Sequence, residues 1–268
     1  MRRVRLALVA VLLMGVGCQS ASQHRNSSVV DYLYPDSRNV QVSSEVPRLT
    51  LPLKVGVAFT PVTGYGPVEL SEVQKTELLQ SVSRNFRDLE FVRSIEIVPS
   101  AYLRPGGSFE NLQQLKRMFD IDVIALVSYD QTRFTDEGWA SIAYWTLVGA
   151  YVVPGEKNAT HTLLDTVVYD IDSRKMLFRA PGTSSVKSSA TPINLQEQTR
   201  KDAAEGFELA SSDLVTNLTS ELEVFRQRIK KAPEEVQIAK REGYQGSGSG
   251  GWFLLLLAFA GLAAARRT

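Results

Sequence analysis

The sequence predicts an α/β (α+β) domain in which helices pack on a mixed β-sheet. Between residues 49 and 231, short apolar runs typical of strands alternate with segments whose apolar residues recur at helical spacing. The run Val123–Tyr129 is apolar almost throughout, as expected for a central strand buried on both faces. The predicted order is β-α-β-α-β-β-β-β-α, and this order favours helices layered on a sheet.

The first half of the domain supplies two strand-helix units ahead of the central strand. Leu53–Phe59 is a strand with partial alternation, and Ser71 with Gln74 forms a capping box at the start of the next helix. That helix places Val73, Leu78, Val82, Phe86 and Leu89 roughly on one face. The second strand and the second helix follow at Ser94–Val98 and Phe109–Phe119.

The second half is predicted to be extended and to end in a long helix. Three extended segments follow the central strand, at Ala140–Val153, Thr160–Ile171 and Lys175–Ser188. The polar residues 172–175 are typical of a hairpin turn between the last two. Apolar residues at helical spacing then predict an amphipathic helix over Asn194–Lys231.

The amino-terminal end has the pattern of an export signal that closes on a cysteine. A basic start precedes an apolar run over Leu6–Val16, which is short for a permanent membrane span. The next residues, Gly17 and Cys18, resemble the lipobox of bacterial lipoproteins, although the usual leucine three residues before the cysteine is Gly15 here. The resemblance implies signal peptide 1–17, cleavage between Gly17 and Cys18, a diacylglycerol on Cys18, and sorting onward to the outer membrane. The alternative is an ordinary secretory signal.

The carboxy-terminal end has a Gly/Ser stretch, a short apolar helix and a basic tip. The stretch includes Gly248, Ser249, Gly250 and Gly251, and the uncharged run Trp252–Ala265 spans only about 21 Å as a helix. Each interior glycine costs about 1 kcal/mol of helix stability, so the outer half unwinds easily.

The basic tip, Arg266 and Arg267, predicts that this end stays cytoplasmic and that the domain lies outside. Together these three parts resemble the GlyGly-CTERM sorting tail, which rhombosortases recognise. The alternatives are a permanent tail anchor and a buried helix of the domain.

A lipobox combined with such a tail resembles the rhombotarget lipoprotein family. Further likeness lies in the segments 144–150, Asp170-Ile171-Asp172 and 177–182. The resemblance implies processing by lipoprotein signal peptidase and a rhombosortase, and it assigns no catalytic residue. At the level of fold alone, the domain resembles the amino-terminal domain of the translocation protein TolB.

The segments that flank the domain are predicted to be flexible. Residues 18–48 are rich in Ser, Gln, Asn and Arg and are expected to form a tether, and residues 232–249 are expected to form a polar linker. The globular domain is therefore placed at 49–231, and the sorting tail at 250–268.

Little in the domain predicts catalysis. The chain has one cysteine and two histidines, His24 in the tether and His161 in the domain, so no metal site or other cofactor is expected. His161 could serve a Ser/His pair with Ser184, Ser185, Ser188 or Ser189, yet no Gly-x-Ser-x-Gly elbow occurs.

Five other groups of residues are candidate sites. The pair Asp170 and Asp172 could suit a glycosidase or a cation, but a hairpin turn explains it as well. Asp120 with Asp122, and Asp136-Glu137-Gly138, fit turns. Gly64-Tyr65-Gly66 lacks the lysine of a phosphate loop. A set of aromatics could line a sugar or peptide groove or simply pack in the core: Trp139, Tyr144, Trp145 and Tyr151.

Two function classes remain open on the sequence. The first is a non-enzymatic, lipid-anchored envelope protein that binds a protein or glycan partner. The second is an envelope hydrolase with a site around Asp170, Asp172 and His161. The chain has 30 basic and 29 acidic residues interspersed, so no nucleic-acid footprint is present.

Overall fold

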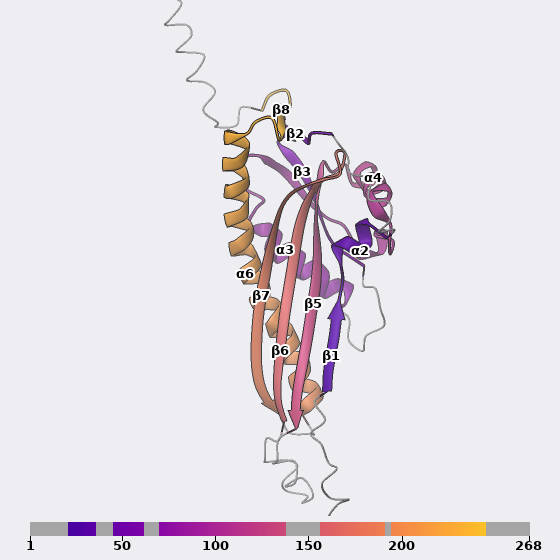
Figure 1. Ribbon diagram of the computed structural model, residues 1–268, viewed down its shortest axis with the longest axis vertical. Coiled ribbons are helices and arrows are strands. Elements are labelled where there is room, and N and C mark those ends of the chain that lie inside the picture. The colour runs from indigo at the N-terminus through magenta and orange to yellow at the C-terminus, as the bar shows by residue number, and fades with distance from the viewer. Residues whose placement is uncertain (1–20, 36–44, 62–69, 138–155, 191–193, 245–268) are drawn as a thin grey trace, which may run out of the picture.

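The computed structural model describes residues 21–35, 45–61, 70–137, 156–190 and 194–244. A twisted mixed sheet runs through this part of the chain (Figure 1). Its main strand order is β4-β3-β5-β6-β7. These strands are β3 (Leu53–Phe59), β4 (Val92–Ile97), β5 (Val123–Glu137), β6 (Glu156–Asp170) and β7 (Lys175–Ala190).

The direction of the strands changes at β5. Strand β3 is parallel to both β4 and β5, whereas β5, β6 and β7 form an antiparallel meander. Parallel strands need crossover connections, and the two helices α3 and α4 supply them. The predicted α+β class with a mixed sheet is therefore confirmed.

Strand β5 is long enough to hold two strands end to end along one edge. Residues Val123–Val127 pair with β3, and residues Asp130–Thr135 pair with β1 (Ala21–Asn26). Strand β6 pairs with β5 along its whole length on the other edge. Hence β1 extends the sheet at the end where β5 finishes (Figure 1).

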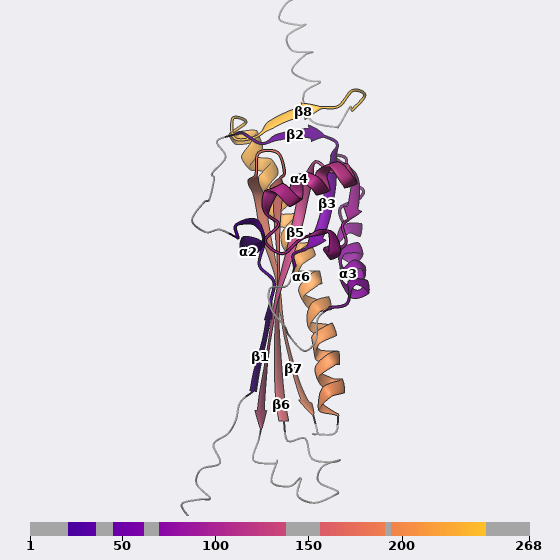
Figure 2. The same cartoon turned by 90° about the vertical axis from the view of Figure 1, so that its right-hand side faces the viewer.

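Helices cover both faces of the sheet, as the edge-on view shows (Figure 2). The helices α3 (Glu72–Arg84) and α6 (Leu195–Lys231) share one hydrophobic cluster with the sheet. The helices α2 (Val29–Leu33) and α4 (Ser108–Phe119), with the short helix η1 (Ser100–Tyr102), lie over a second cluster.

The central strand supplies alternate side chains to both clusters. Val123, Ala125 and Val127 point to the α3/α6 side, and Ile124 and Leu126 point to the α2/α4 side. This is the period-two alternation of a strand. All five are buried, so the sequence prediction for this run is confirmed.

The capping box and the long terminal helix are also as predicted. The Ser71 hydroxyl accepts from the Gln74 backbone N–H at 3.2 Å, and the Gln74 side chain accepts from the Ser71 N–H at 3.0 Å. The buried face of the helix that they start differs from the predicted one. Val73 is exposed, and Lys75 is buried instead. Lys75 takes that position because its ammonium pairs with Glu72 at 2.9 Å.

The predicted tether over residues 18–48 is wrong for its structured part. Strand β1 pairs with β5, and α2 buries Val29, Tyr32 and Leu33. The Tyr32 hydroxyl donates to Asn111 of α4 at 2.9 Å. One turn with apolar residues at positions i, i+3 and i+4 is enough to dock a segment, even when the segment is polar overall.

The predicted linker over residues 232–249 is also wrong in part. Strand β8 (Gln237–Lys240) pairs in parallel with β2 (Arg48–Leu51), and this two-stranded sheet lies at one end of the domain (Figure 1). Arg241 anchors it, because its Nη2 donates to both carboxylate oxygens of Asp122, at 3.0 and 2.8 Å. The folded domain therefore extends past the expected limits of 49–231 on both sides.

Two further predictions concern residues at or beyond the end of β5. Asp136 and Glu137 are the last residues of β5 and not a turn. The predicted extended segment Ala140–Val153 lies outside the described residues. Among the helices in the described ranges, none combines the length and the apolar character that crossing a membrane requires.

Candidate functional site

The carboxylates of the predicted hydrolase site have structural partners. Asp170 is buried and accepts from the Ser173 backbone N–H at 3.0 Å and from the Ser173 hydroxyl. Asp172 is exposed and pairs with Lys116 of α4. One carboxylate therefore shapes the β6–β7 turn, and the other holds that turn against α4.

His161 lies far from both carboxylates. It is nine residues before Asp170 on β6, which corresponds to about 30 Å along the strand. Its neighbours across the sheet are Thr132 and Ser185. The structure thus does not bring His161, Asp170 and Asp172 into one site.

Two of the candidate serines fix α6 on β7. The Ser184 hydroxyl donates to the Gly206 carbonyl oxygen at 2.7 Å, and the Ser188 hydroxyl donates to Asp202. The close approach at Gly206 leaves no room for a larger residue, since an added Cβ would lie 2.6 Å from Thr162 Oγ1. These contacts give both serines a packing role.

Asp120 and Asp122 close the junction between α4 and β5, as the turn interpretation predicted. Asp120 has the left-handed φ of 52° at the end of α4. The Lys54 ammonium beside Asp120 holds the pKa of that carboxyl below its usual range. Asp122 accepts from the Lys54 backbone N–H at 2.9 Å and pairs with Arg241.

Two buried tyrosines on the opposite face are held neutral. Burial raises the pKa of Tyr169 to about 12, and it raises the pKa of Tyr32 further. Neither hydroxyl is therefore a good general base near neutral pH. Among the residues described, no three His, Cys, Asp or Glu side chains are grouped as a metal site would require.

Several predicted site residues lie outside the described residues. They are Gly17 and Cys18, the tail residues Gly248, Ser249, Gly250, Gly251, Arg266 and Arg267, the Gly64-Tyr65-Gly66 segment, and the aromatics Trp139, Tyr144, Trp145 and Tyr151.

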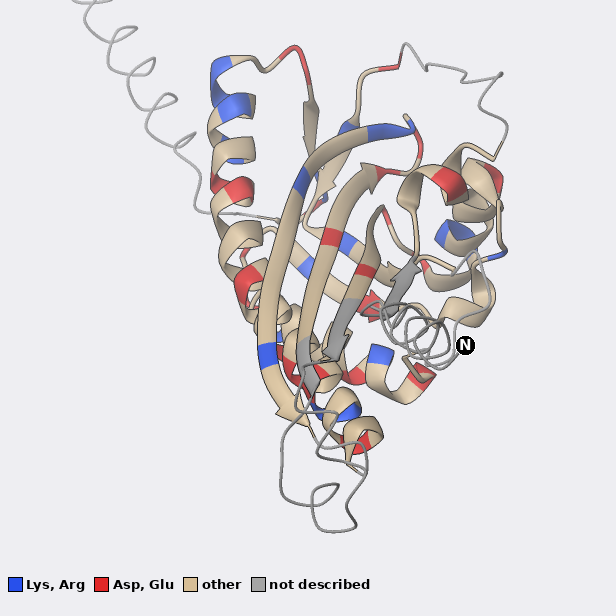
Figure 3. Cartoon of the chain, turned by 60° about the horizontal axis from the view of Figure 1, so that its bottom comes forward, with Lys and Arg blue, Asp and Glu red and all other residues tan. Residues whose placement is uncertain are grey.

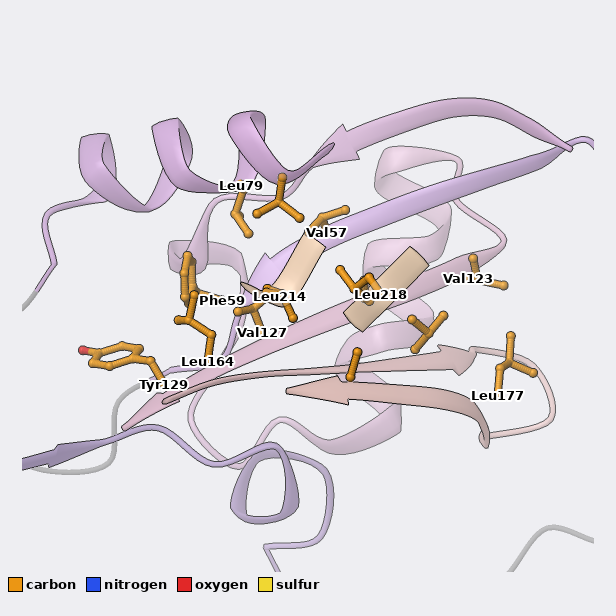
Figure 4. Packing of buried hydrophobic residues seen from close by; sticks show 14 of the residues in the cluster. Val57, Phe59, Leu79, Val123, Val127, Tyr129, Leu164, Leu177, Leu214 and Leu218 are labelled. Carbon is orange, nitrogen blue, oxygen red and sulfur yellow. The ribbon is translucent and has the colours of Figure 1, made fainter. Parts of the chain in front are cut away.

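An apolar cavity is the best candidate for a site in the described structure. It has a volume of about 390 Å³ and lies between α3, α6 and the sheet. Its lining residues include Leu79 of α3, Val57 of β3, Leu218 of α6 and Leu177 of β7, which Figure 4 shows among the buried side chains of the core. Pockets of about 300–1,000 Å³ with apolar walls are typical of small-molecule sites.

The wall of this cavity is incompletely covered. Val55, Leu78, Phe86, Phe178 and Ile229 all line it and all remain partly exposed. Apolar surface that stays in contact with water is costly, at about 25 cal/mol per Å². A bound apolar group would recover part of this free energy.

One polar atom inside the cavity lacks a partner. Thr166 lines the cavity from β6, is only 2% exposed, and has a hydroxyl without a hydrogen-bond partner in the described structure. A buried hydroxyl without a partner is uncommon and calls for a physical reason. A bound molecule or water that reaches Thr166 would supply one.

Charged residues gather at the mouth of the cavity. Arg226 and Lys230 come from the last turns of α6, where Figure 3 shows several basic residues, and Lys240 comes from β8. Glu90 is the one acidic residue among the lining residues. The Arg226 guanidinium lies 5.7 Å from the centre of the Phe91 ring and pairs with Glu223 at 3.2 Å.

The sequence reasoning missed this cavity, although part of its signal was visible. The apolar face of α6 continues to Leu222, Phe225 and Ile229, and these three side chains line the cavity. The space between this end of α6, helix α3 and strand β8 is left open. Which elements meet there depends on the pairing of β2 with β8, which the sequence did not indicate.

Comparisons with known proteins give a weak likeness of fold. No family model and no curated protein matches the chain. A dodecameric PelC L103M variant from Paraburkholderia phytofirmans is 13% identical, with a TM-score of 0.31, over 73% of this chain and 96% of that chain. A protein described as a neuraminyllactose-binding hemagglutinin homologue from Helicobacter pylori is 10% identical, with a TM-score of 0.40, over 70% and 95%.

A third structure is similar at the same level. Protein XCC0632 from Xanthomonas campestris, of family model DUF330, is 12% identical, with a TM-score of 0.32, over 72% of this chain and 96% of that chain. TM-scores of this size carry no argument about what this chain does.

Proposed function

We propose that this protein is an exported bacterial envelope lipoprotein whose domain is a non-enzymatic binding module. In this proposal, a diacylglycerol on Cys18 anchors the mature protein, and a rhombosortase removes the tail after Gly248–Gly251. The proposal combines the sequence patterns at both ends with one geometric property of the domain.

That property is the position of the two ends of the domain. Ala21 pairs with Thr135 near the end of β5, whereas Arg241 binds Asp122 next to the start of β5. Thirteen strand residues separate these points, which corresponds to about 40 Å. The chain therefore leaves the domain at opposite ends of strand β5.

This separation supports a temporary role for the tail. Only three residues lead from Cys18 to Ala21, and they span at most about 10 Å. If the acyl groups and the tail occupied one membrane together, residues 242–251, which span at most about 35 Å, would have to be drawn out along nearly the whole length of the domain for it to stand on its acylated end. Removal of the tail removes that requirement.

The positions and contacts of the candidate catalytic residues support a binding module. Asp170 and Asp172 hold a turn, and His161 lies about 30 Å from them. A general base and a nucleophile must lie within hydrogen-bond reach of one another or of the substrate. The apolar cavity, by contrast, is a formed concave space with charged groups at its mouth.

The intact mass of the mature protein tests the processing part. We expect a mass that lacks residues 1–17, carries acyl groups on Cys18, and ends near Gly250. Cys18→Ala should remove the acyl mass and release the trimmed protein from the membrane. Gly250→Leu with Gly251→Leu should extend the helix and prevent trimming.

Two results would contradict the processing part. A mature chain that still ends at Thr268 would indicate a permanent tail anchor. Membrane retention of Cys18→Ala after demonstrated loss of the tail would exclude the acyl groups as the anchor.

A further inference from the structure

We propose that the cavity between α3, α6 and the sheet binds one long-chain fatty acid. The hydrocarbon chain occupies the apolar interior, and the carboxylate lies at the mouth near Arg226, Lys230 and Lys240. This inference rests on the proposed binding-module function and specifies its ligand. Four features of the described residues carry it.

The first feature is the shape and chemistry of the interior. The wall is built almost entirely from aliphatic and aromatic side chains of α3, α6 and the sheet. If a methylene group is given the volume of a water molecule, about 30 Å³, the cavity of about 390 Å³ holds about a dozen of them. Each buried methylene contributes about 0.8 kcal/mol, so one chain of this length can bind stably.

The second feature is the charge at the mouth. Three cationic side chains and one acidic side chain, Glu90, lie among the lining residues. Lys230 and Lys240 form no ion pair with any other residue in the described ranges. An anionic head group would therefore find two available ammonium groups, whereas a cationic head group would be repelled.

The third feature is the Thr166 hydroxyl, which is buried in the wall without a partner in the described structure. A wall built only for core packing would place valine there, as it does at Val168 two residues further along the same face. A hydroxyl in this position indicates that the space holds a molecule or water at least part of the time.

The fourth feature argues against a competing occupant, the apolar tail of this chain. The tail over Trp252–Ala265 ends in Arg266 and Arg267, so a tail seated in the cavity would add two cationic side chains near a mouth that is already cationic.

Photoaffinity labelling of the protein in isolated envelope membranes tests the proposal. The probe is a fatty acid with a diazirine in its chain and a terminal alkyne. Because the membranes are isolated, the probe cannot enter the Cys18 anchor by metabolism. We expect adducts on peptides of α6 and β3 that line the cavity, with competition by the unlabelled fatty acid and no labelling by an alkylamine of equal length.

Two pairs of variants separate the cavity from its surroundings. Lys230→Glu with Lys240→Glu should lower the labelling at least about fivefold, as two lost ion pairs predict, and Lys231→Glu, which does not line this cavity, should not. Leu218→Trp should fill the interior and abolish labelling. Leu209→Trp on the exposed side of the same helix is its control.

Two results would overturn the proposal. They are equal labelling by the amine probe and unchanged labelling in the double charge reversal. Lys230 and Lys240 are exposed, so we expect their replacement to leave the fold intact. The charge-reversal variant therefore tests the proposal even if Leu218→Trp does not fold. The intact mass of the same samples reports the anchor independently, so a failure of the ligand is distinguishable from a failure of the lipoprotein assignment.

Discussion

Replacing each carboxylate of the β6–β7 turn separates a structural role from a catalytic one. We expect Asp170→Ala to destabilise the domain strongly and Asp172→Ala to do so only slightly. A catalytic pair predicts the opposite pattern, in which both changes abolish activity and leave stability nearly unaltered. The two residues are close in sequence, so each serves as the control for the other.

The magnitudes follow from burial and hydrogen bonding. Asp170 is 3% exposed and accepts from both the N–H and the hydroxyl of Ser173. A hydrogen bond to a charged group contributes about 1.5–3 kcal/mol, and a buried donor left without a partner adds a penalty, so Asp170→Ala should cost about 3 kcal/mol. Asp172 is 63% exposed in its pair with Lys116, which is worth at most about 1 kcal/mol.

Pulse proteolysis of the full chain over a urea series measures both changes. With a slope of about 2 kcal/mol per M, Asp170→Ala should lower the midpoint by about 1.5 M and Asp172→Ala by less than about 0.5 M. Asp170→Asn, which keeps one acceptor oxygen, should lie between Asp170→Ala and the unaltered protein.

Equal midpoints for Asp170→Ala and the unaltered protein would refute this reasoning. So would a loss of cellular function in Asp172→Ala at normal protein level, because the exposed ion pair gives no structural reason for it. Either result would return the hydrolase hypothesis to consideration.

Three further changes can be measured with the same urea series. Gly182→Ala should lower the midpoint by about 1 M, because the added Cβ would lie 2.3 Å from a backbone oxygen of α6 and overpacking costs about 1–3 kcal/mol. An unchanged midpoint would contradict the close approach of β7 to α6. Thr166→Val should raise the midpoint of the ligand-free protein, because it removes a buried hydroxyl without a partner in the described structure; a lowered midpoint would indicate that Thr166 has one. Burial acts to raise the pKa of Glu72, but hydrogen bonds from Ser100 and Lys75 outweigh it and lower that pKa from 4.5. The folded-state pKa is depressed, so the stabilisation by Glu72 should be present above pH 4.5 and be lost progressively as the pH falls through the folded-state pKa. Glu72→Gln should therefore lower the midpoint at pH 7 and lower it less at pH 3.

The elements that the sequence predicted well are those whose signal is local and long. The run Val123–Tyr129 is apolar almost throughout because both faces of β5 are covered, and the capping box at Ser71 needs only two side chains three residues apart. The long helix α6 keeps its apolar spacing from Phe207 to Ile229. Such patterns are visible without knowledge of the tertiary structure.

The elements that it missed depend on partners far away in sequence. Strand β1 is polar and is held by backbone pairing with β5, more than 100 residues later. Strands β2 and β8 are four residues long each and pair across nearly the whole domain. Backbone hydrogen bonds do not require a particular side chain, so composition alone made both segments resemble flexible linkers.

The candidate site shows the same limit. Cationic residues near the end of α6 are ordinary helix chemistry, since they interact favourably with the helix dipole. They become the mouth of a cavity only because β8 and α3 lie beside them. The residues of the site are therefore visible in the sequence, but their proximity in the folded domain is not.

The proposed anchor, the proposed ligand and the fold constrain one another. Cys18 is three residues from β1, which lies along the end of β5, whereas the cavity is lined by Val123, Ala125 and Val127 at its start. From Val127 to Thr135 is about 26 Å along the strand. On the proposed route, an acylated and trimmed protein would stand with β1 at the membrane and hold the cavity away from it. A fatty acid in the cavity would then have to come from a source other than the acyl groups of Cys18. A membrane protein that delivers or accepts this fatty acid would have to reach the end of the domain that points away from the membrane, where Lys230 and Lys240 lie.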